Sequence, residues 1–177
     1  MSRGLLSLPF LVLMAGAATA QEKENHEKEE AGEAAKATPA LATALKETKV
    51  SLASGLHAAE KEGRPISGKF ELEDGKLQLS VYTMKGDTFS EVIVDHKTGK
   101  VAKSEAITGG EDLAAARKQA EAMAKTKHTL RDVISRAEKA NPGYHAVSIV
   151  PEIEDGKAQA DLTLLKGGSS KSVEEPL

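Results

Sequence analysis

A nine-residue stretch that occurs twice is the feature that most restricts the fold of this chain. ELEDGKLQL at residues 71–79 returns as EIEDGKAQA at residues 152–160. Each copy centres on Asp-Gly, a pair that favours the left-handed backbone of a two-residue hairpin turn, and alternating apolar residues flank it. The chain is therefore predicted to contain two copies of one supersecondary unit.

A helix is predicted ahead of each hairpin. Residues 51–61 place Leu52, Leu56 and Ala59 on one helical face, and residues 129–139 repeat this apolar face ahead of the second hairpin. A third β-rich segment, TFSEVIVD at residues 88–95, follows the first hairpin. The expected fold class is α+β, with two tandem units that each consist of a helix plus a three-stranded antiparallel sheet (α-β-β-β).

The domain boundaries follow from changes in composition. Residues 1–20 have a basic start, an apolar run and an Ala-Thr-Ala ending, which predicts a signal peptide cleaved after Ala20. Residues 21–38 are predicted to be a charged, flexible segment. The first unit is expected over residues 39–106, and a linker helix with the second unit over residues 107–177. We therefore expect a periplasmic or secreted protein with no stable membrane insertion after removal of the signal.

Composition argues against several classes of function. The chain has no cysteine, which excludes thiol nucleophiles, disulfides and cysteine-based metal sites. It carries 24 Lys+Arg and 27 Asp+Glu, and the acidic excess is concentrated in residues 22–33. Because the remaining charges balance, no basic face is indicated, and nucleic acid is not an expected partner.

No catalytic or metal-binding motif is recognised. HEKEE at residues 26–30 lacks the second histidine of the H-E-x-x-H zinc motif, and the five histidines show no ligand spacing. The carboxylate pairs Glu73-Asp74 and Glu154-Asp155 suit acid–base chemistry in principle, but hairpin turns account for them. We expect a protein that is not an enzyme, with no catalytic, cofactor-binding or metal-binding residues and no cofactor.

The end of the first unit resembles a known family. VDHKTGKV at residues 94–101 is similar to the V-D-x-x-T-G-K-V turn that closes a PepSY domain, and the preceding helix and Asp-Gly hairpin lie where that family has them. The second unit resembles the same family through TLRDVISRAEK, AVSIVPEI and ADLTLLKGG, so the resemblance covers nearly all of residues 39–177.

The resemblance implies small exported modules that bind or inhibit peptidases, and no catalytic residues belong to the family pattern. The expected function is therefore binding of a partner, either a peptidase or another envelope protein. The alternative is a small-ligand or metal-sensing module of the envelope, which would use the acidic segment near His26 and the cleft between the units.

The third segment of the second copy differs from the first. SSKSVEEPL carries Glu174 and Glu175 where the first copy has Ile93 and Val94, so it is expected to pair poorly as a strand. Residues 160–165 would then keep a partly open edge that accepts an extended segment of a partner by strand addition. The alternative is a short charged edge strand that prevents aggregation.

Four residues are candidates for contact with a partner. Asp161, Thr163 and Leu165 alternate along the strand that is expected to have an open edge. Tyr82 has the opposite strand parity from Leu79, which favours either a surface contact or packing at the sheet edge.

Overall fold

The computed structural model describes residues 39–177, which belong to one compact unit. The predicted signal peptide, the charged segment 21–38 and His26 lie outside the described residues. None of the helices within residues 39–177 is long and apolar enough to span a bilayer. The elements in chain order are α2 (Pro39–Ala44), the 3₁₀ helix η1 (Leu45–Glu47), α3 (Leu52–Ala59), β1 (Arg64–Glu73), β2 (Lys76–Lys85), β3 (Thr88–Val94), β4 (Val101–Ile107), α4 (Gly110–Ala124), α5 (Leu130–Ala140), β5 (His145–Glu154), β6 (Lys157–Lys166) and β7 (Ser169–Pro176).

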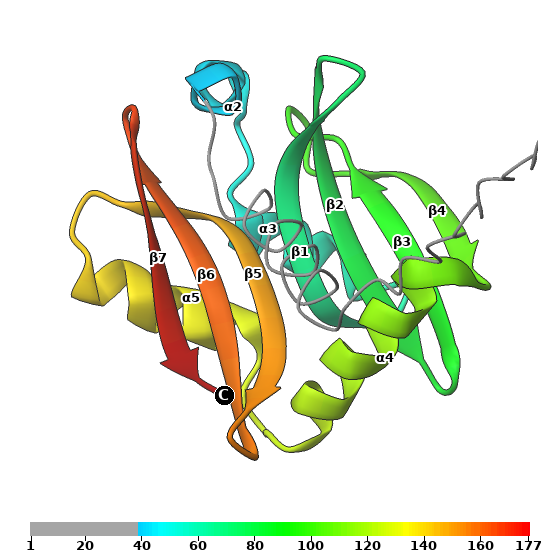
Figure 1. Cartoon of the computed structure of the whole chain (residues 1–177). Coiled ribbons are helices and arrows are strands. Elements are labelled where there is room, and N and C mark those ends of the chain that lie inside the picture. Colours follow the sequence, from blue (N-terminus) through cyan, green and yellow to red (C-terminus); the bar gives the residue numbers. More distant parts are fainter. Residues whose placement is uncertain (1–38) are drawn as a thin grey trace, which may run out of the picture. The chain divides into compact units, whose positions relative to one another are not determined.

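The seven strands form one antiparallel sheet in the order β4-β3-β2-β1-β5-β6-β7. Figure 1 shows α3 and α5 behind this sheet and α4 in front of it. The α+β class expected from the sequence is confirmed.

Both Asp-Gly hairpin turns form as predicted. Asp74 and Asp155 each have a φ of 48°, and Gly75 and Gly156 have φ of 75° and 76°. Positive φ at both central positions is what a two-residue turn of this kind requires. The turns join β1 to β2 and β5 to β6, with Glu73 opposite Lys76 and Glu154 opposite Lys157.

The repeat extends to the register of the sheet. The pairing of β1 with β2 shifts between Pro65 and Ser67, and the pairing of β5 with β6 shifts at the equivalent positions, Ala146 and Ser148. An irregularity that recurs at the offset of the sequence repeat is a property of the unit, because a β-bulge fixes local strand twist and bend.

The two halves of the sheet meet along a short seam between β1 and β5. Only Gly68 with Ile149 and Lys69 with Ser148 pair there. Gly68 and Ile149 are separated by the same offset as the two copies of the hairpin, so each strand pairs with its own copy at the same position. An antiparallel contact of this kind is isologous and places a local pseudo-two-fold axis at the Gly68–Ile149 pair.

Two sequence-based expectations about the strands are wrong. The first half contributes a fourth strand, because β4 pairs with β3 from Phe89–Ile107 to Val94–Val101. Moreover, β7 pairs with β6 over its whole length, so residues 160–165 have no open edge. The glutamates of β7 are tolerated because this strand is itself the sheet edge, where charged side chains reach solvent.

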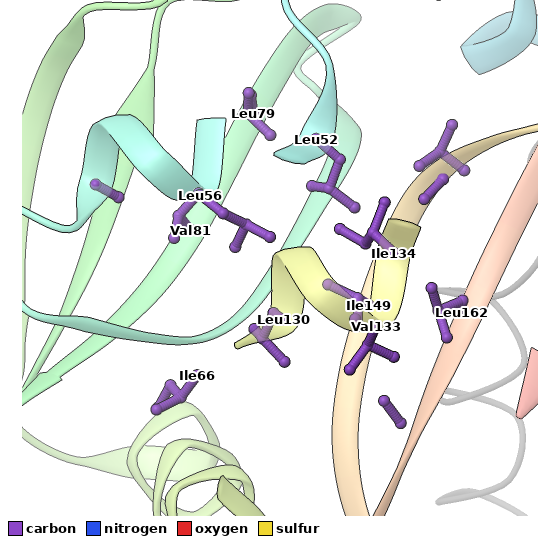
Figure 2. Close-up of a cluster of buried hydrophobic side chains, with 14 of the residues drawn as sticks. Leu52, Leu56, Ile66, Leu79, Val81, Leu130, Val133, Ile134, Ile149 and Leu162 are labelled. Carbon is purple, nitrogen blue, oxygen red and sulfur yellow. The ribbon is translucent and has the colours of Figure 1, made fainter. Parts of the chain in front are cut away.

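The buried side chains of both halves form one core. Figure 2 shows Leu52 and Leu56 of α3, Leu130 and Ile134 of α5, and Ile149 of β5 in this cluster. Each is at most 2% exposed. The helices that carry them begin at capped positions: Ser51 accepts from the amide of Ser54, and Thr129 forms a capping box with Asp132.

Candidate functional site

The seam between the halves is flanked by two hollows. Because β1 and β5 pair at only two positions, they diverge on both sides of the pseudo-two-fold axis. The hollow on one side is lined by the segment leading into α3, and the other by the segment leading into α5. Several lining residues are repeat equivalents: Leu52 and Leu130, Glu138 and Glu60, and His145 and Arg64.

The first hollow, which we name the apolar groove, has a volume of about 390 Å³. Its inner surface consists of buried apolar side chains from four elements and the segment before α3: Val50, Leu52, Phe70, Ala146, Val147 and Leu165. Ala42 of α2 and Leu45 of η1 form its outer wall. An exposed hollow of this composition is suited to an apolar side chain of another molecule.

The wall formed by α2 and η1 is lightly packed. Neither element contains a fully buried residue, and Ala42 and Leu45 are half-buried. Their repeat equivalents on α4, Ala120 and Met123, are 9% and 1% exposed. The position that α4 fills in the second half is thus less completely covered in the first.

The second hollow, which we name the cationic pocket, has a volume of about 660 Å³. Buried Leu56, Met123 and Leu130 form its floor. Its rim carries the cations Arg64, Lys127 and Arg131 together with His128, against one carboxylate, that of Glu60.

Two of these cations are held in place by local contacts. Arg64 Nη2 donates to the carbonyl oxygen of Met123 at 2.9 Å and to that of Thr126 at 3.5 Å, at the end of α4. Arg131 Nη2 lies 3.2 Å from Glu60 Oε1. Arg131 Nε is buried and has no hydrogen-bond partner within residues 39–177.

Comparison of the repeats shows which of these charges occur in both copies of the unit. The repeat equivalents of Arg64, Lys127 and Arg131 are His145, Lys49 and Ala53. Lysine is thus present in both copies at one position, whereas both arginines occur in only one. The same architecture forms without them.

The four residues predicted to contact a partner are in equivalent parts of the sheet. Tyr82 is in register with Ser67, and its repeat equivalent Thr163 is in register with Ser148. Thr163 and Leu165 are 4% and 7% exposed. Leu165 faces the apolar groove. Asp161 is exposed and Tyr82 is half-buried, so these two remain the accessible members of the set.

Both accessible residues have a perturbed pKa. Burial, followed by the negative charges of Glu91 and Glu71, raises the pKa of the Tyr82 hydroxyl well above its usual range. Partial burial, followed by repulsion from Glu152 and Glu174, raises the pKa of Asp161 to about 6.

Metal binding has no candidate ligand set in the described part of the chain. Within residues 39–177, no three His, Asp or Glu side chains lie together in a way that could hold a metal ion. The histidines that contact carboxylates are His57, with Glu60 at 2.9 Å, and His145, with Glu138 at 3.9 Å, and both histidine side chains are largely exposed.

Comparison with known proteins identifies no family. No family model matches the chain, and no curated protein matches it. Among solved structures, the chain is similar to the crystal structure of a protein from Clostridium difficile 630 described as a "putative lipoprotein". The two are 14% identical, the match covers 72% of this chain and 95% of that one, and the TM-score is 0.37. A similarity of this size assigns neither fold nor function.

Sequence reasoning named a cleft between the units but, apart from Leu165, none of the residues that line the two hollows as part of a site. Their walls combine segments far apart in the chain, such as residues 60–65 with residues 123–131 in the cationic pocket. A local sequence pattern does not predict that two such distant segments lie side by side. The available signal was the comparison of the two copies, in which Ala53 is replaced by Arg131 and His145 by Arg64.

Proposed function

We propose that this chain is an exported, non-enzymatic protein of two tandem PepSY-like units that binds another envelope protein, with a peptidase as the first candidate. Three observations support the two units: the repeated hairpin, the repeated register shift and the pseudo-two-fold seam. In this description, each unit has the α-β-β-β pattern and the first adds β4. Export rests on the sequence of residues 1–20.

The segment that resembles the PepSY turn has a structural role consistent with the proposal. Asp95 Oδ1 accepts from the amides of Thr98 and Lys97, and hydrogen bonds from Thr98 first, then from Lys97, lower the pKa of the Asp95 carboxyl. The carbonyl of His96 accepts from Thr48 Oγ1 at 2.8 Å and from the Lys49 amide at 2.9 Å. The turn therefore fixes the segment that lines the apolar groove.

The apolar groove is the observation that carries the binding function. Its outer wall is a short helical segment whose Leu41, Ala42 and Leu45 are only half-buried against the core. These side chains show what fits at this position, namely a short amphipathic segment with small and aliphatic residues. The proposed occupant is a segment of the partner protein with the same chemistry, which would extend or replace this wall.

Filling the groove should weaken binding without disturbing the core. Ala42→Trp places an indole in the groove, whereas Ala40→Trp adds the same side chain at an exposed position of the same helix. A photoreactive phenylalanine analogue at Lys46, which also lines the groove, is used to crosslink the partner in intact cells and to identify it by mass spectrometry.

Binding measurements with the purified protein and its identified partner then test whether the groove is the binding site. By calorimetry with the identified partner, Ala42→Trp should weaken binding at least about tenfold, and Ala40→Trp should leave the Kd within about twofold. If the partner is a peptidase, its rate of peptide hydrolysis provides a second readout. Equal affinities for the two variants would show that the groove is not the binding site.

A further inference from the structure

The cationic pocket lies outside the surface used in the proposed function. It flanks the seam on the side of α5, and its floor and its rim differ in chemistry. Leu56, Met123 and Leu130 line the floor of the pocket, so a ligand with a nonpolar part would find apolar atoms to contact there.

The rim favours a negative charge. Arg64, Lys127 and Arg131 face a single carboxylate, Glu60, which already contacts Arg131 and His57. Guanidinium groups held in place by backbone carbonyls or a carboxylate are pre-organised, so less side-chain entropy is lost when they bind an anion.

One donor in this pocket lacks an acceptor. Arg131 Nε is buried and makes no hydrogen bond within residues 39–177, although its Nη2 is held 3.2 Å from Glu60. A buried N–H of a charged group without a partner is costly. Rotation of the Arg131 side chain, which is 41% exposed, toward the pocket would let a ligand oxygen accept from this donor.

The other copy of the unit argues against a purely structural role for these charges. Ala53 and His145 stand where the second pocket has Arg131 and Arg64, and the helix and strand form equally well around them. The arginines therefore occur at only one of two equivalent sites, and the fold of the other site does not depend on them.

From the apolar floor, the cationic rim and the unpaired Arg131 donor, we infer that this pocket binds a ligand with an apolar body that ends in a carboxylate. The C-terminal residue of a peptide and the head of a fatty acid share this chemistry. In either case the carboxylate contacts Arg131 and Lys127, and the aliphatic part covers Leu56 and Met123. An inorganic anion would leave the floor unused.

Matched ligands test the role of the carboxylate. The purified ¹⁵N-labelled protein is titrated with N-acetyl-Ala-Leu, with the amide of the same dipeptide, and with decanoate, while the amide signals of residues 126–131 are followed by NMR. We expect at least one carboxylate to shift these signals and to bind about tenfold more tightly than the uncharged dipeptide amide. Preference for the dipeptide identifies a peptide C-terminus, and preference for decanoate identifies a fatty acid.

Variants distinguish binding from folding. Lys127→Gln, at an exposed position, should weaken carboxylate binding about threefold, and Arg131→Gln about tenfold with partial recovery in Arg131→Lys. Glu60→Gln removes the competing negative charge but keeps an amide oxygen that can accept from Arg131, so it should strengthen binding, an effect that loss of stability does not produce. Lys49→Gln, the repeat equivalent of Lys127, is the control and should change nothing.

Two outcomes would overturn the inference: equal binding of the free dipeptide and its amide, or carboxylate-induced shifts confined to residues outside the pocket. Ala42→Trp, which fills the apolar groove, should leave this titration unchanged. Failure of one site is therefore distinguishable from failure of the other.

Discussion

At the scale of single residues, the acidic face of β6 is an unfavourable electrostatic arrangement. Partial desolvation, followed by repulsion from Glu152, Glu174 and Glu154, raises the pKa of the Asp161 carboxyl to about 6. Its equivalent in the first half is Ser80, which instead donates to Glu71 at 2.8 Å. The same position thus carries a hydrogen bond in one copy and a repelling charge in the other.

Removing that charge should stabilise the protein in a pH-dependent way. The pKa of Asp161 is higher in the folded state than the ordinary value of 3.8, so its favourable contribution is complete below about pH 3.8 and is lost as the pH rises through about 6. Asp161→Asn should therefore raise the free energy of unfolding at pH 7.5 by about 1 kcal/mol, because solvent exposure screens the repulsion, and change it little at pH 4. Urea unfolding at the two pH values measures this, with Glu121→Gln as a control. A gain of the same size at pH 4 would refute the electrostatic explanation.

Residue types at the turns were the most predictable part of the chain. Asp-Gly predicted both hairpins because few other pairs accept positive φ at two successive positions, and the structure has that conformation in both. By contrast, the role of Arg131 was not predictable. Its meaning depends on Glu60 and on a buried donor, and neither is visible without the three-dimensional contacts.

At the scale of elements, the two equivalent helix–sheet contacts differ in where the larger side chain lies. In one contact it comes from the strand, and in the other it comes from the helix. A Cβ atom at Gly55 of α3 would overlap Cδ2 of Leu79 on β2 and lie 3.1 Å from its Cγ. The equivalents of these two residues are Val133 and Ala160, both fully buried. One copy thus combines glycine with leucine, and the other combines valine with alanine, so that volume is conserved across the contact.

Moving the larger side chain from β2 to α3 should show that the two positions are energetically coupled. Gly55→Val should destabilise the protein by about 2 kcal/mol through overpacking, and Leu79→Ala by about 3 kcal/mol through the cavity it leaves. The double variant should lose less than the sum by at least about 1 kcal/mol, because the valine occupies the space vacated by the leucine. Chemical unfolding gives the three values. Gly55→Val with Leu164→Ala, a buried residue on the other half of the sheet, serves as the additive control.

Among the elements, the helices and the inner strands agree closely with the sequence-based predictions, whereas the two edge strands of the sheet do not. Residues 51–61 and 129–139 were predicted as helices, and α3 and α5 occupy residues 52–59 and 130–140. β4 was missed because its central residues are exposed on both faces and show no apolar alternation. β7 was expected to pair poorly because of its glutamates, but an edge strand needs only one paired side.

At the scale of the whole molecule, the two halves share a sheet and a core although they pair at two positions only. The pairing of β1 with β5 was not predictable from the sequence. The two strands lie far apart in the chain, and neither contains a local pattern that identifies the other as its neighbour in the sheet. The hollows exist only as consequences of the seam, so they were unpredictable for the same reason.

The shared core should make unfolding cooperative across both halves. Tyr82 is in the first half and Tyr144 lies just before β5, so fluorotyrosine labels at the two positions report on each half separately by ¹⁹F NMR. Both native signals should disappear at the same denaturant concentration. Ser148→Pro, at one of the two paired positions of the seam, should shift both midpoints together. Separate midpoints in the unsubstituted protein would instead indicate two independently stable domains.

The pseudo-two-fold seam also bears on ancestry. Because β1 and β5 meet at equivalent residues, the contact is self-complementary, and a single copy of the unit could form it with a second molecule of itself. Joining two copies in one chain converts a concentration-dependent homodimer into a monomer whose halves are always together. It also lets the copies diverge, which no homodimer permits. A duplication of this unit would therefore account for a pocket with arginines and an apolar groove at two equivalent places in one chain.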